Sequence, residues 1–81
     1  MDRKMIQDHL ALAEQHVEEG KAIIKRQRDL IARLSADGHD VTQAKALLAQ
    51  FIDTQWTHMA DKDRLQRELV AFDEAAKGDE P

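Results

Sequence analysis

The chain has no cysteine and no tyrosine, and only one proline and three glycines among its 81 residues. The lack of cysteine excludes disulfides, thiolate metal sites and thiol nucleophiles. Few turn-forming residues, with 35% charged and 42% apolar residues, are typical of a helical protein with a large polar surface. No apolar run approaches the roughly 20 residues that cross a bilayer, and the chain opens on an amphipathic pattern. We therefore expect one small, helical, cytoplasmic domain.

Motifs for catalysis are also scarce. Ser35 is the only serine, and no base and carboxylate are arranged to activate it. The sequence contains no glycine-rich phosphate-binding loop. These features argue against an enzyme, and no cofactor is expected.

The segment Gly38-His39-Asp40-Val41-Thr42-Gln43 divides one long helical pattern into two nearly equal halves. Gly38 can adopt the left-handed conformation that ends a helix. Asp40 can cap the next helix, and Gln43 can complete a capping box. A connection of about three residues makes its helices antiparallel neighbours. The sequence predicts an all-α, coiled-coil-like antiparallel hairpin, with helices over about 3–36 and 41–77 and a turn over about 37–40.

Apolar residues at alternating spacings of four and three predict the seam along which the two helices pack. Polar residues interrupt this seam at Gln27, Gln55, His58 and Lys62. Such residues commonly set register and partner number, with a ligand pocket as the alternative interpretation. Gly20 favours close approach of the second helix, with Trp56 or Met59 as the expected neighbour. The apolar seam residues are Leu10, Val17, Ile24, Ile31, Leu48, Phe51, Leu65, Leu69 and Phe72.

A second set of apolar residues lies away from the seam. One seam of mostly aliphatic side chains buries little area against the conformational entropy lost on folding. Surplus apolar side chains usually mark a partner surface. We expect a homodimer in which two hairpins pack as a four-helix bundle. The expected dimer or partner interface consists of Leu12, Ile52, Trp56 and Met59.

The histidines suggest a metal-binding alternative. If residues i and about 78 − i face each other across the hairpin, His16 lies near Lys62 and within one turn of His58. Imidazoles inside a bundle could bind zinc or iron. However, His9 and His16 are about 10 Å apart along one helix, and the Glu-x-x-His pattern of di-metal bundles is absent. We expect no metal site and interpret the histidines as polar positions that fix pairing, or as solvated flanks.

The net charge of −4 hides an uneven distribution. Residues 1–20 carry five acids against two bases, whereas residues 21–33 carry five bases against one acid. Basic helix faces can contact nucleic-acid phosphates, which is a second alternative function. The overall acidity and the lack of interleaved aromatic residues favour a solvated, ion-paired face instead. The possible phosphate contacts are Lys21, Lys25, Arg28 and Arg33.

Three separated segments together resemble a known group of sequences. They are the run from His9 to Gly20, the Gly38-His39-Asp40 turn and the run from His58 to Leu65. The chain is similar here to a set of uncharacterised short bacterial helical-hairpin proteins of unknown function. The resemblance implies a cytoplasmic helical hairpin and brings no activity, ligand or catalytic residue. From the residues themselves we expect a small homodimeric adaptor or regulatory protein that binds another protein.

Overall fold

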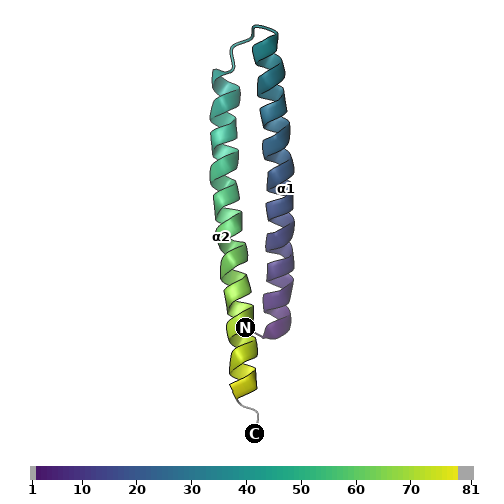
Figure 1. Ribbon diagram of the computed structural model, residues 1–81, viewed down its shortest axis with the longest axis vertical. Coiled ribbons are helices and arrows are strands. Elements are labelled where there is room, and N and C mark those ends of the chain that lie inside the picture. The colour runs from purple at the N-terminus through teal and green to yellow at the C-terminus, as the bar shows by residue number, and fades with distance from the viewer. Residues whose placement is uncertain (1, 79–81) are drawn as a thin grey trace.

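Two long helices lie side by side and run in opposite directions in the computed structural model, which describes residues 2–78 (Figure 1). Helix α1 spans Arg3–Ala36 and helix α2 spans Thr42–Gly78. The molecule is a rod with extents of 70 × 15 × 14 Å. The predicted all-α class and the two-helix layout are confirmed. Neither α1 nor α2 is long and apolar enough to cross a membrane.

Helix α1 has a defined cap at each end. The Asp2 carboxylate accepts a hydrogen bond from the backbone amide three residues on, at 2.8 Å, which satisfies one free amide of the first turn. At the other end, the His39 amide donates to the Leu34 carbonyl at 2.9 Å, and the Gly38 amide donates to the Ser35 carbonyl at 3.1 Å. This pair of bonds is a Schellman motif, which requires a left-handed residue. Gly38 supplies it with a φ of 80°.

Helix α2 begins one residue later than the sequence suggests. The first backbone hydrogen bond runs from the Lys45 amide to the Val41 carbonyl, so Val41 and not Asp40 occupies the cap position. The Asp40 carboxylate nevertheless accepts from the Thr42 hydroxyl at 2.7 Å and from the Thr42 amide at 2.9 Å, as in an Asx turn. Since α2 begins at Thr42, the expected hydrogen bond from Asp40 to a free amide at the helix start is present. These bonds lower the pKa of the Asp40 carboxyl because they stabilise its charged form.

The register of the hairpin differs from the expected one by about one helical turn. His16 contacts His58 directly, whereas the sequence argument placed Lys62 opposite His16 and His58 within one turn of it. At the turn, α1 extends beyond the start of α2, because the connection runs back along the rod before α2 begins (Figure 1). Because of this offset, a residue of α1 faces a residue of α2 that comes earlier in the sequence than expected.

The seam is only shallowly buried. Among the predicted apolar seam residues, Val17 and Leu65 are buried, and Phe72 near the open end remains 37% exposed. Half-buried seam positions are Leu10, Ile24, Ile31, Leu48, Phe51 and Leu69. In the part of the chain that the structure describes, no large side chain is completely enclosed. Two helices alone therefore leave their common core open along both flanks.

An ion pair joins the helices at the open end of the rod. The Arg3 guanidinium donates from Nε to the Asp73 carboxylate at 2.8 Å and from a terminal nitrogen at 3.3 Å. These hydrogen bonds lower the pKa of Asp73 and raise that of Arg3. Because both side chains are exposed, the pair contributes little to stability and serves mainly to align the helix ends.

Candidate functional site

Two buried glutamines connect the helices through backbone carbonyls. Gln27 of α1 donates from Nε2 to the Ala44 carbonyl of α2 at 2.9 Å. Gln55 of α2 donates from Nε2 to the Val17 carbonyl of α1, also at 2.9 Å. Sliding one helix along the other would break both bonds and leave buried amides unpaired, which is costly. The geometry supports a register-setting role for these two polar seam residues.

Gly20 lies directly against the Gln55 amide. A Cβ built at position 20 would overlap the Gln55 side-chain oxygen, so a Cα hydrogen of Gly20 points at that oxygen. Such Cα–H···O contacts recur where helices pack closely. The contact accounts for Oε1 being buried without a conventional donor. The close approach expected at Gly20 is therefore made by Gln55, and not by Trp56 or Met59.

An apolar groove with a basic rim runs along one flank of the seam and encloses about 480 Å³. Ile24 of α1 and Ile52, Trp56 and Met59 of α2 supply its apolar lining. Trp56 is 64% exposed there. The charged residues that line the groove are Lys21, Lys25, Arg28 and Asp29, all from α1. The structure thus brings three of the four predicted interface residues together.

Leu12, the fourth predicted interface residue, lies on the opposite flank. It is 50% exposed and lines a separate groove with His9, His16 and Arg64. Since an α-helix turns by about 100° per residue, positions 9, 12 and 16 flank the seam on the side away from 21, 25 and 28. The four residues therefore do not form one continuous patch within a single hairpin.

The histidine pair belongs to the seam. The rings of His16 and His58 lie with centroids 5.0 Å apart at an angle of 45°. Both line a small hollow of about 80 Å³, together with Glu19. Among residues 2–78, no group of three or more His, Cys, Asp or Glu side chains converges as a metal site requires. For the metal-binding alternative, the structure thus brings two imidazole ligands together, fewer than the four ligands of a structural zinc site.

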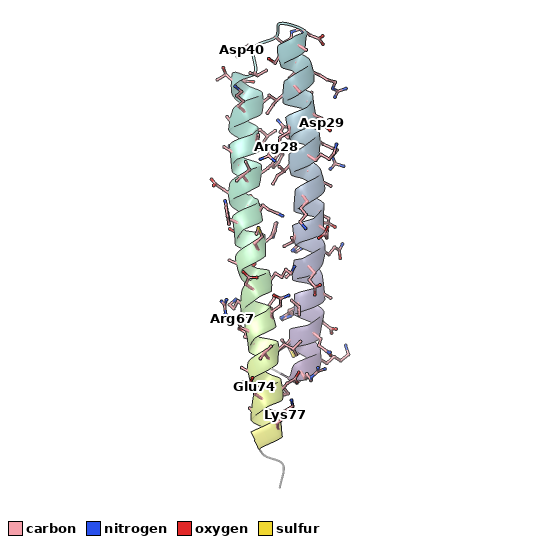
Figure 2. All side chains as sticks on the ribbon, viewed as in Figure 1. Arg28, Asp29, Asp40, Arg67, Glu74 and Lys77 are labelled. Carbon is pink, nitrogen blue, oxygen red and sulfur yellow. The ribbon has the colours of Figure 1, made fainter. Side chains whose placement is uncertain are left out.

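The basic residues predicted to contact nucleic acid are divided between two surfaces. Lys21, Lys25 and Arg28 line the apolar groove, whereas Arg33 lines another hollow on the opposite flank. Lys21 is paired with Glu18 at 3.1 Å, and Lys25 with Asp29 at 2.8 Å. Arg28, which lies in the half of α1 nearer the turn, makes no ion pair within residues 2–78 (Figure 2).

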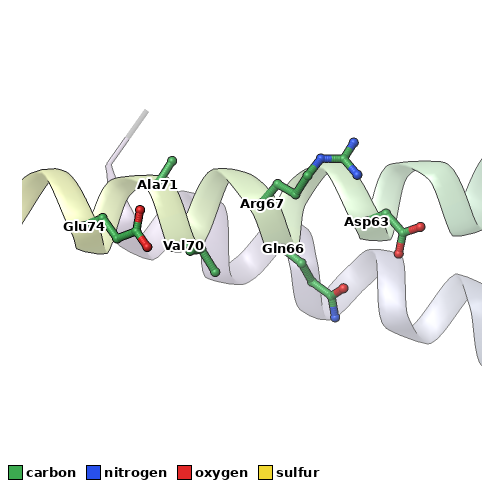
Figure 3. A pocket seen from close by; sticks show the side chains of 6 residues that line it. All are labelled: Asp63, Gln66, Arg67, Val70, Ala71 and Glu74. Carbon is green, nitrogen blue, oxygen red and sulfur yellow. The ribbon is translucent and has the colours of Figure 1, made fainter.

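A second hollow continues along the same face of α2 toward the open end. Asp63 and Val70 follow Trp56 at seven-residue intervals, which keeps all three on one face of the helix. Asp63 and Val70, but not Trp56, line a hollow of about 420 Å³ that also includes Gln66 and is formed by α2 residues alone (Figure 3). Val70 is exposed. The uncovered surface of α2 thus extends well beyond the Trp56 groove.

These features define a class of protein, a two-helix coiled-coil hairpin with interhelical amide contacts and an uncovered apolar groove. No protein-family model matches the chain, and neither a curated protein nor a solved structure matches it. The function is therefore inferred from the chemistry of the groove.

Proposed function

We propose that the protein is a non-enzymatic, homodimeric helical interaction module, in which two hairpins pack as a four-helix bundle and act as a small adaptor or regulator. One observation carries this proposal: residues 2–78 expose more large apolar side chains than they bury. The buried apolar residues are Ile6, Ala13, Val17 and Leu65. The exposed large ones are Met5, Leu12, Leu47, Trp56, Met59, Val70 and Phe72.

The Trp56 groove has the composition of an interface centre. Tryptophan and methionine are enriched in protein interfaces, and tryptophan in particular supplies much of the binding energy. Here Trp56 and Met59 stand beside Ile52, with charged residues only at the edge of the groove. An apolar centre with a polar rim is the usual anatomy of a protein–protein contact. A second hairpin placed here would also cover the open seam beneath.

One observation favours nucleic acid as a second candidate partner. Trp56 lies in the same groove as Lys21, Lys25 and Arg28, and an exposed indole among cations can stack on a base. The chain is acidic overall, which opposes phosphate binding, and the centre of the groove is apolar, so the groove suits a protein better. Titration of Trp56 fluorescence with a single-stranded oligonucleotide at low salt distinguishes the two candidate partners. A groove that binds only protein predicts no quenching.

The fluorescence of Trp56 tests self-association directly, because it is the only tryptophan in the chain. In the dimer, the indole leaves water and enters an apolar contact. We therefore expect blue-shifted emission and weak acrylamide quenching in concentrated protein. On dilution through the dissociation constant, the emission should shift to the red and the quenching should increase. Emission typical of a solvated indole at every concentration would contradict the proposal.

A further inference from the structure

The occupant of the Trp56 groove can be specified further, on the basis of the proposed dimer. We infer that the groove is filled by a second copy of the chain lying antiparallel, so that the turn of one hairpin lies beside the open end of the other. Three observations carry this orientation: the distribution of charge along the rod, the position of Trp56 and the location of unpaired acidic side chains.

Charge differs between the two hollows on this flank of the rod. The Trp56 groove, toward the turn, is lined by three basic residues and one acidic residue. The hollow toward the open end is lined by one basic residue and two acidic residues. A parallel dimer would place like-charged hollows side by side. An antiparallel dimer places the positive groove of each copy against the negative hollow of the other, which is the complementary arrangement.

Trp56 lies close to the middle of the rod. Its neighbour Gln55 bonds to Val17, which is near the centre of α1. In a two-fold symmetric dimer, a patch on the symmetry axis packs against its own copy. For an antiparallel pair of rods this axis crosses the rods near their midpoint. The apolar part of the groove is therefore placed where the two copies would share it.

The charged residues on either side of Trp56 are placed so that they can form ion pairs between the two copies. Lys21 and Arg28 line the groove and lie on the turn side of Val17 along α1. Glu14 precedes Lys21 by seven residues on the same face of α1, and Asp63 follows Trp56 by seven on the same face of α2. Neither Glu14 nor Asp63 makes an ion pair within residues 2–78. A two-fold axis near Trp56 brings the cations of one copy to these carboxylates of the other.

Spin-label distances measure the orientation, and the absence of cysteine allows one label per chain. The Ala36→Cys variant places a label on an exposed residue at the turn end of α1. With an axis at the level of Val17, the two labels of an antiparallel dimer are about 57 Å apart, at 1.5 Å per residue. A parallel dimer brings them within about 25 Å, the width of a bundle. The short distance overturns the inferred orientation alone, whereas no dipolar coupling at high concentration overturns the dimer itself.

Charge reversal provides a second, independent test. The Lys21→Glu/Arg28→Glu variant should weaken dimerisation about 10-fold at low salt, because cations facing carboxylates become anions. The effect should shrink as salt screens the contacts. In a parallel pair this change only exchanges one like-charge contact for another, so unchanged affinity contradicts the orientation. The matched control, Arg26→Glu/Arg33→Glu, makes the same change in net charge on the opposite flank and should leave affinity unchanged.

Discussion

Replacing Trp56 and Met59 with serine is expected to weaken dimerisation by at least about 100-fold. Both side chains line the apolar groove and remain exposed in the single hairpin, so their loss removes mainly contacts that the dimer makes. At concentrations where the variant is still dimeric, its helical content should be retained. Sedimentation equilibrium over a concentration series gives the dissociation constant, and circular dichroism reports the helices.

The matched control for this variant is Leu47→Ser. Leu47 is 41% exposed and Met59 40%, so the two side chains start from the same degree of exposure. Leu47 does not line the Trp56 groove, and its replacement should leave the dissociation constant within about twofold of the original, the usual range for a surface substitution away from a contact. Equal weakening by Leu47→Ser and by Trp56→Ser/Met59→Ser would show that the groove is not the contact surface.

Replacing Gly20 with alanine is expected to destabilise the hairpin by about 1 kcal/mol, although helix propensity alone favours alanine by about the same amount. The new Cβ would occupy the position of the Gln55 amide oxygen. Gln55 would then have to leave its buried site, losing its hydrogen bond to Val17 and the packing around it. The sign of the change therefore separates a tight interhelical contact from an ordinary helical glycine. Urea denaturation at fixed protein concentration measures this change in the free energy of unfolding.

A double-mutant cycle isolates this contact. In the Gln55→Ala background, the site facing Gly20 is vacated, and Gly20→Ala should become stabilising by up to about 1 kcal/mol. The coupling between positions 20 and 55 is then about 2 kcal/mol. Gly78→Ala serves as the control, because a Cβ at Gly78 meets no other atom within 4 Å. Stabilisation of the original protein by Gly20→Ala would contradict the contact.

The helices were predictable because local chemistry determines them. The alternation of spacings of four and three can be satisfied only by helices packed on one another, and Gly38 ends the first helix by its backbone conformation. The cap of α2 was harder to predict. Composition favours Asp40 over Val41 at a helix start, and only the hydrogen bonds at Thr42 and Lys45 show that α2 begins one residue later.

The register was not predictable from spacing. Shifting one helix by a turn preserves an apolar repeat almost unchanged, so the sequence pattern alone does not distinguish neighbouring registers. The path of the connection and the bonds from Gln27 and Gln55 to opposing carbonyls determine it. Both glutamines and Gly20 stood out in the sequence. The contact between Gly20 and Gln55, however, could have been found only with the correct register.

The grouping of the interface residues shows the same limit. Ile52, Trp56 and Met59 share one helix, so their spacing alone predicts one stripe, and the structure places them in one groove. Leu12 lies on the other helix. Which flank of α1 adjoins that stripe depends on how the two helices pack, and Leu12 falls on the far flank. Its membership of the interface remains a prediction.

The solution mass of the isolated chain tests the central claim most directly. The claim is that one hairpin leaves too much apolar surface in water and is completed by a second copy. Sedimentation equilibrium at micromolar concentration is predicted to give twice the chain mass of 9.2 kDa. It should fall toward the single-chain value on dilution, together with the red shift of Trp56 emission. A stably folded single chain of 9.2 kDa at every concentration would contradict the account.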